Sequence, residues 1–189
     1  MKLITLNCHS LEEPDYEKKL RLFCDAVCRE QPHIIALQEV NQTKIASPAD
    51  PLKISGSGYR SCMEASPLTG ESAVPLKTDN HALRVADLFM QAGFRCTWTW
   101  VPAKTGYGRY DEGLALFSRY PVLDTYQFPI TGIQDYDNWK TRKALGIRVH
   151  TPAGPQHFFS LHMGRLRSRD DSRSHCFENG SSSSFHHPM

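Results

Sequence analysis

The stretch His33-Ile-Ile-Ala-Leu-Gln-Glu-Val40 decides how this chain of 189 residues folds. Its apolar run from Ile34 to Leu37 is typical of a strand that is covered on both faces. Residues 2–8, rich in Leu, Ile and Thr, predict another strand, and residues 14–31 between them predict a helix that ends at Pro32. Such a crossover is right-handed and makes its two strands parallel. The opening of the chain therefore predicts an α/β fold.

The rest of the chain predicts one domain followed by a tail. Residues 41–78 show no period and predict a long connection, after which Asp79 or Asn80 is expected to cap a helix that ends at Gly93. Four further strands are expected at residues 94–101, 113–118, 143–150 and 156–162. The last segment, residues 165–189, has almost no aliphatic side chains and a run of four serines, so it cannot bury enough apolar surface to offset its ordering entropy. We predict a domain over residues 1–164 and a disordered tail.

The composition and net charge of the chain exclude few classes of function or partner. A formal net charge of +2 neither indicates nor excludes a nucleic-acid partner, because a basic groove can lie on a nearly neutral protein. The apolar run at the N-terminus is too short for a membrane span or a secretory signal, and we expect a cytoplasmic protein. Cys24 and Cys28, four apart in a predicted helix, are more simply explained as packing than as ligating residues.

Two oxygen-bearing side chains are expected to meet at one edge of the sheet. Asn7 ends the first predicted strand and Glu39 ends the second. Because the carboxyl ends of parallel strands share an edge, and ligands of open α/β folds bind there, the two are candidates for one site. An amide oxygen and a carboxylate are hard ligands that suit Mg²⁺. Taken singly, Asn7 is better explained as a turn residue and Glu39 as a solvated charge. Taken together at matching strand ends, the two explanations are even.

Further candidates follow in the second half of the chain. A glycine-rich loop is expected to present Tyr110 and Glu112, a phenol and a carboxylate that can hold a phosphate oxygen and orient a histidine. Arg142 begins a predicted strand, and its planar guanidinium can donate hydrogen bonds to a phosphate oxygen. His162 ends the last predicted strand. The simpler alternatives are a hairpin loop with surface charges, a surface arginine and a hydrogen-bonded core histidine.

Four motifs in their order along the chain resemble the endonuclease/exonuclease/phosphatase superfamily, the deoxyribonuclease I-like enzymes. They are LNCHS, HIIALQEV, YDEGLALFSRYP and SLHMG, which begin at Leu6, His33, Tyr110 and Ser160. The resemblance covers roughly residues 1–164. It implies the front half of a four-layered α/β sandwich and a hydrolase of phosphoester bonds that depends on Mg²⁺ or Mn²⁺.

The resemblance also implies a role for each candidate residue. Glu39 is expected to be the direct Mg²⁺ ligand, with Asn7 beside it in the metal and phosphate site. In the family, water attacks phosphorus in line while the metal stabilises charge on the phosphate oxygens.

The other implied roles concern the phosphate. Tyr110 falls in the region that helps to bind the scissile phosphate, and Arg142 resembles an arginine on the phosphate side. Glu112 resembles the acid that orients a histidine. His162 resembles that histidine, which contacts the phosphate and acts as general acid.

The chain departs from the family pattern after His162. The family continues with an Asp-x-Asn segment and a Ser-Asp-His, which supply the water-activating pair, and neither occurs downstream of His162. Asp170, Asp171 and His175 lie in a segment without a strand pattern and are not expected to replace them. We therefore expect a C-terminally truncated domain with little turnover, and an uncovered sheet face that favours association.

Three functions stay open on the sequence alone. The first is a metal-dependent phosphoesterase whose substrate is DNA, RNA, a lipid head group, an inositol phosphate or a small phosphoester. The second is a catalytically inactive remnant that keeps weak metal, phosphate or nucleic-acid binding. The third is a module that stacks Trp98, Trp100 and Trp139 on nucleic acid, although Trp98 and Trp100 share a strand face and are more simply explained as a core layer. No protein partner is predicted.

Overall fold

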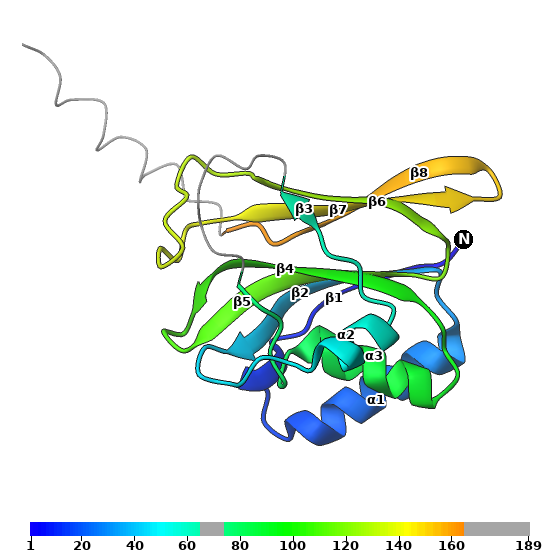
Figure 1. Cartoon of the computed structure of the whole chain (residues 1–189), viewed down its shortest axis with the longest axis horizontal. Helices are drawn as coiled ribbons and strands as arrows, with labels where there is room; N and C mark the ends of the chain where they lie inside the picture. Colours follow the sequence, from blue (N-terminus) through cyan, green and yellow to red (C-terminus); the bar gives the residue numbers. More distant parts are fainter. Residues whose placement is uncertain (65–73, 165–189) are drawn as a thin grey trace, which may run out of the picture.

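Two sheets packed face to face, with helices on one outer side, make up the fold (Figure 1). The computed structural model describes residues 1–64 and 74–164, so the tail predicted at residues 165–189 lies outside the described residues. The layers run helix, sheet, sheet, which is three layers of the four-layered α/β sandwich (Figure 1).

The first sheet contains the predicted crossover. Its four strands lie in the order β1 (Leu3–Asn7), β2 (Ile34–Thr43), β5 (Tyr110–Ser118) and β4 (Thr97–Gly106). Strands β1 and β2 are parallel, with Asn7 opposite Gln38, whereas β5 is antiparallel to both of its neighbours. The predicted parallel pair is therefore confirmed.

Helices cover the outer face of this sheet (Figure 1). They are the 3₁₀ turn η1 (Ser10–Glu12), α1 (Tyr16–Glu30), α2 (Pro51–Gly56) and α3 (His81–Gln91). The predicted cap of α3 is confirmed, because the side chain of Asn80 accepts a hydrogen bond from the backbone N–H of Leu83 at 3.1 Å. None of the helices in the described ranges is both long enough and apolar enough to cross a membrane.

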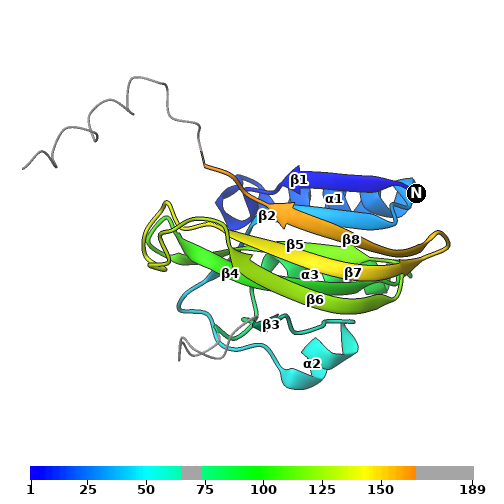
Figure 2. The same ribbon diagram turned by 90° about the horizontal axis from the view of Figure 1, so that it is seen from above.

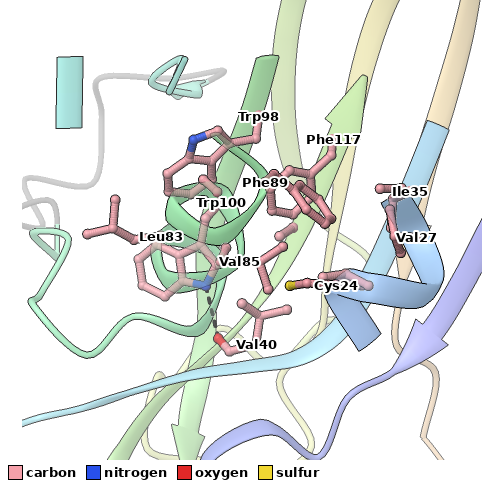
Figure 3. Close-up of a cluster of buried hydrophobic side chains, with 14 of the residues drawn as sticks. Cys24, Val27, Ile35, Val40, Leu83, Val85, Phe89, Trp98, Trp100 and Phe117 are labelled. Atoms are coloured by element: carbon pink, nitrogen blue, oxygen red, sulfur yellow. Dashed lines mark hydrogen bonds between the residues drawn. The ribbon is translucent and has the colours of Figure 1, made fainter. Parts of the chain in front are cut away.

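A cluster of buried hydrophobic side chains, aliphatic and aromatic, fills the space between the helices and the first sheet (Figure 3). Trp98 and Trp100 are buried there, 1% and 2% exposed, and Trp98 stacks on Phe117. The indole N–H of Trp100 donates to the carbonyl oxygen of Val40 at 2.9 Å. Because both indoles lie in the core, they cannot stack on nucleic acid.

The second sheet lies over the first and is packed on it by a second apolar cluster. Its strands lie in the order β3 (Met63–Glu64), β6 (Val122–Pro129), β7 (Lys143–Thr151) and β8 (Gly154–Leu161). Strand β6 was not predicted, because only Val122 among its residues is buried and its sequence carries no clear apolar alternation. Seen from above, β1 lies beyond the edge of this sheet (Figure 2). No helix of the described residues covers its outer face, where Phe128 and Phe159 are 42% and 44% exposed.

The connection predicted at residues 41–78 is more ordered than expected in its described parts. A buried polar network holds it, in which Gln42 accepts from the backbone N–H of Lys77 and donates to Asp111. Lys77 forms an ion pair with Asp111 at 2.9 Å, and Tyr136 donates to the other oxygen of the same carboxylate. Side-chain amides and buried ion pairs carry no periodic signal, so the apolar pattern could not reveal this order.

Gly113 generates the first prediction. A Cβ at this position would lie 2.3 Å from the carbonyl oxygen of Val101 and 2.5 Å from the indole nitrogen of Trp100. Gly113→Ala should therefore lower the free energy of unfolding by about 1–3 kcal/mol, as overpacking does. Urea denaturation measures it, with Gly132→Ala as control because nothing lies within 4 Å of a Cβ there. Equal stability of the two variants would contradict the packing described for Trp100.

Candidate active site

A β-bulge in β2 turns Glu39 out of the sheet. Gln38 pairs with Leu114 and Val40 pairs with the next residue, Gly113, so Glu39 is the extra residue. Its φ of 53° lies in the left-handed region, which costs a non-glycine residue roughly 1–3 kcal/mol and is concentrated at functional sites. Leu37 and Val40 both belong to the helix-side core. The bulge therefore keeps Val40 in the core and frees Glu39 from it.

Asn7 meets Glu39 at the edge where β1 and β2 end. Its side-chain Nδ2 donates to Oε1 of Glu39 at 2.9 Å, while its Oδ1 accepts from the backbone N–H of His9 at 3.1 Å. The two residues predicted to converge are thus in contact. In this geometry the amide oxygen of Asn7 is engaged with His9, so Asn7 orients the carboxylate of Glu39.

His162 lies between two carboxylates just beyond the end of β8. Its Nε2 is 3.5 Å from Oε1 of Glu39, and its Nδ1 is 3.7 Å from Oε1 of Glu112. Ser160, two residues earlier, donates to the carbonyl oxygen of Leu37 at 3.1 Å and accepts from the side chain of Gln38 at 3.1 Å. These bonds join the second sheet to β2 beside the bulge, and they explain why His162 reaches Glu39.

Glu112 lies within β5, not in the loop where it was predicted, and so does Tyr110. Its carboxylate forms an ion pair with Lys104 at 2.7 Å, and the side chains are 8% and 11% exposed. Burial raises the pKa of Glu112, but the contacts with His162 and Lys104 outweigh it and hold that pKa below its ordinary value. Lys104 was not predicted from the sequence, although a hairpin register that pairs Gly106 with Tyr110 places it opposite Glu112.

Tyr110 points to a different neighbourhood from the one predicted. Tyr110 is buried, and the guanidinium carbon of Arg109 lies over its ring, 4.9 Å from the ring centroid. A hydrogen bond with Tyr110 contributes to the lowered pKa of Glu12, after the larger effect of Arg109. The second tyrosine of this hairpin, Tyr107, is exposed, and its hydroxyl contacts Nε2 of His9 at 3.1 Å.

Tyr107 reports the electrostatics of the site. Partial desolvation is the largest cause that raises the pKa of Tyr107. The negative charges of Glu39, Glu112 and Glu12 raise it further, in that order of size. Three carboxylates therefore act on one phenol at this edge of the fold. Glu12 and Glu112 form ion pairs with Arg109 and Lys104, whereas the carboxylate of Glu39 lies beside the imidazole of His162.

Arg142 lies beside the same site. It lines a small pocket together with Lys104, Glu112 and His162. Its Nη1 donates to the backbone carbonyls of Trp139 and Thr141 at 2.5 and 2.8 Å, so part of its guanidinium is engaged by its own loop. The structure thus brings Asn7, Glu39, Glu112, His162 and Arg142 to one place and directs Tyr110 toward Glu12.

The donors present fit part of a divalent-cation site. The carboxylate of Glu39, turned outward by the bulge, is one hard oxygen ligand, and Mg²⁺ often binds through one or two carboxylates completed by water and phosphate oxygens. Within residues 1–64 and 74–164, no group of three or more His, Cys, Asp and Glu side chains is placed to hold a metal ion. The described residues therefore supply an incomplete set of protein ligands.

The Lys104–Glu112 pair generates the second prediction. Because the folded pKa of Glu112 is lowered, its ion pairing stabilises the fold above the unfolded pKa of Glu and is lost as pH falls through the folded pKa. Lys104→Met should lower the free energy of unfolding by about 3–5 kcal/mol at pH 7. The loss should shrink as pH falls from 7 to about 4, below the ordinary pKa of Glu, because the unpaired carboxyl of the variant can then take up a proton.

Urea denaturation at the two pH values checks this. Lys53→Met is the control, because its pair with Asp87 at 2.6 Å is more exposed and should contribute less than about 1 kcal/mol. A loss in Lys104→Met that does not depend on pH would show that Lys104 stabilises through packing alone.

Comparison with known proteins agrees with this architecture. A profile of the Endonuclease/Exonuclease/phosphatase family matches residues 4–178. Among solved structures, an endonuclease/exonuclease/phosphatase family protein from Leptotrichia buccalis is 21% identical with a TM-score of 0.70, and the match covers 87% of this chain and 54% of that protein. An endonuclease/exonuclease/phosphatase from Beutenbergia cavernae is 16% identical with a TM-score of 0.53, over 86% of this chain and 38% of that protein.

The likeness to the solved structures concerns the fold, and this chain spans about half the length of the Leptotrichia buccalis protein. The search of curated proteins finds no match. The profile match extends over most of the chain, including all four motifs quoted above. The chain belongs to the endonuclease/exonuclease/phosphatase family.

Proposed function

We propose that this protein is a hydrolase of phosphoester bonds that depends on Mg²⁺ or Mn²⁺. The observation that carries the proposal is the left-handed bulge that turns Glu39 toward Asn7 and His162. A strained backbone that places one largely buried carboxylate beside an imidazole has no evident role in folding, but it suits a site that holds a cation and a phosphate.

Each residue of the site would have its own role in this reaction. Glu39 would hold the cation, and Asn7 would orient the carboxylate through the bond to Oε1. When bound, the metal would stabilise negative charge on the phosphate oxygens. His162 would donate a proton to the leaving oxygen, with Glu112 on its Nδ1 side fixing the ring. Arg142 would contact the phosphate with the guanidinium nitrogens that its own loop leaves available.

The phenols on the β4–β5 hairpin are candidates for binding the substrate. Tyr110 keeps the phosphate-side role that the family motif implies, although in this structure its ring faces Arg109 and Glu12. The other tyrosine, Tyr107, has its pKa raised in part by the negative charges of Glu39, the candidate metal ligand, and Glu112. The proposed substrates include DNA and other nucleic acids, and the proposed location is cytoplasmic.

A second candidate function is metal and phosphate binding without appreciable turnover. The described residues offer the cation one well-oriented carboxylate, and the sequence after His162 has neither Asp-x-Asn nor Ser-Asp-His to activate water. Loss of a general base typically lowers the rate by about 10²–10⁴. On this alternative the chain binds Mn²⁺ through Glu39 but hydrolyses an activated diester no faster than buffer does.

Hydrolysis by the parent chain separates these possibilities, and replacing Glu39 tests the metal site that both of them share. We expect Glu39→Gln to weaken Mn²⁺ binding by about tenfold or more, because the variant loses a charged ligand. It should also abolish any metal-dependent hydrolysis of bis(4-nitrophenyl) phosphate. Water-proton relaxation measures the binding, and Glu30→Gln, which removes only an exposed partner of Lys2, is the control. If Glu39→Gln binds Mn²⁺ as the parent chain does, the metal site is elsewhere.

Replacing His162 tests its role as general acid. His162→Ala should slow the hydrolysis of a diester with an alkoxide leaving group by about 10²–10⁴-fold. The nitrophenolate of bis(4-nitrophenyl) phosphate leaves without a proton, so its hydrolysis should change much less. His150→Ala, at an exposed position of β7, is the control. An equal loss with both substrates would assign His162 to phosphate binding.

A further inference from the structure

Trp139 lies on the surface, in the connection between β6 and β7. It is 66% exposed, more than any other tryptophan, tyrosine or phenylalanine in residues 1–64 and 74–164. Unlike Trp98 and Trp100, it has no part in the core of the fold. An indole in this position offers a large, flat apolar face to a partner.

The loop that carries Trp139 is fixed to the fold on both sides of the indole. Before it, the backbone N–H of Thr105 donates to the carbonyl oxygen of Tyr136 at 2.7 Å, and the hydroxyl of Tyr136 donates to the buried carboxylate of Asp111 at 3.0 Å. After it, Nη1 of Arg142 donates to the carbonyl oxygen of Trp139 itself. A ring that is held in place before a ligand arrives binds it at a lower cost in conformational entropy.

Arg142 also connects Trp139 to the candidate active site. The arginine that bonds to the backbone of Trp139 lines a small pocket with Glu112 and His162. The β6–β7 connection lies at the same end of the molecule as the turn between β4 and β5 (Figures 1 and 2). A substrate whose phosphate contacts Arg142 therefore has its neighbouring group within reach of the indole.

The charges around Trp139 restrict what this neighbouring group can be. The ammonium of Lys140 lies 5.4 Å from the centre of the indole ring, and Arg142 adds a second positive charge. The nearest acidic residue in the chain, Asp137, is paired with Lys44 at 3.1 Å. A cationic group such as choline, which an isolated indole can bind, is repelled here. A neutral planar group joined to anionic phosphate is favoured.

We propose that Trp139 stacks on an unpaired nucleobase beside the phosphate that Arg142 contacts, which makes single-stranded nucleic acid the substrate class. Every base has a flat face, and stacking on aromatic side chains holds single strands without sequence preference. Inside a duplex the neighbouring bases cover these faces, so the indole has no access to them. This inference rests on the proposed function, because it takes the phosphate at Arg142 to be the one that is hydrolysed.

Two fluorescently labelled strands of equal length test the proposal on the full chain. One is oligothymidine, and the other is an abasic strand with the same phosphates and no bases. Both carry phosphorothioate linkages, which resist hydrolysis, so Mn²⁺ can be present while anisotropy measures binding. We expect oligothymidine to bind about tenfold more tightly or better, because only its bases can stack. Equal affinity for the two strands would overturn the proposal.

Variants locate the stacking at the indole. Trp139→Ala should weaken the binding of oligothymidine by about tenfold and leave that of the abasic strand unchanged. Trp139→Phe should keep part of the affinity, because a phenyl ring still stacks. Phe128→Ala is the control, since it removes an exposed aromatic ring from the outer face of the second sheet. An equal loss for both strands in Trp139→Ala would overturn the assignment.

Two further measurements separate the alternatives. Phosphocholine binding that is lost in Trp139→Ala, with oligothymidine binding retained, would overturn the proposal in favour of a lipid head group. Absence of Mn²⁺-dependent hydrolysis of bis(4-nitrophenyl) phosphate would contradict the proposed function. It would leave the contact at Trp139 to be decided by the two strands, because their binding is measured without turnover.

Discussion

The hydrogen bond from the indole of Trp100 to the carbonyl oxygen of Val40 holds the part of the sheet on which the site depends (Figure 3). Val40 follows the bulged residue Glu39, so the bond fixes the backbone immediately after the bulge. The indole can reach it because Gly113, the residue opposite Val40, has no Cβ to occupy the same space. A small residue, a buried aromatic N–H and one carbonyl thus maintain a strained conformation at Glu39.

The second sheet brings His162 to the carboxylate of Glu39, which the bulge has turned out of the first sheet. Ser160 and Gln38 join β8 to β2, and the chain then carries His162 to the side chain of Glu39. Lys104 on β4 forms an ion pair with Glu112, whose carboxylate faces Nδ1 of His162. The site is therefore a product of sheet packing: each sheet supplies one side of it, and β1 contributes Asn7 at the edge.

Regular elements could be predicted from the sequence, and irregular ones could not. The apolar run after His33 and the helical spacing before it sufficed for the parallel pair and for the meeting of Asn7 with Glu39. The bulge has no pattern in the sequence, because Glu39 differs from its neighbours only in backbone conformation. Lys104 was missed because its partner lies across a hairpin whose register had not been worked out. Tyr110 was placed in a loop because the glycines before it indicated flexibility, whereas the strand begins at that residue.

The central claim is that the bulge presents Glu39 to a divalent cation, and anomalous diffraction from crystals grown with Mn²⁺ tests it most directly. The account predicts an anomalous peak at about 2.0–2.3 Å from a carboxylate oxygen of Glu39, with the amide of Asn7 still in contact with that carboxylate. A bound Mn²⁺ with no peak near Glu39, or a Glu39 that has returned to regular strand geometry, would contradict it.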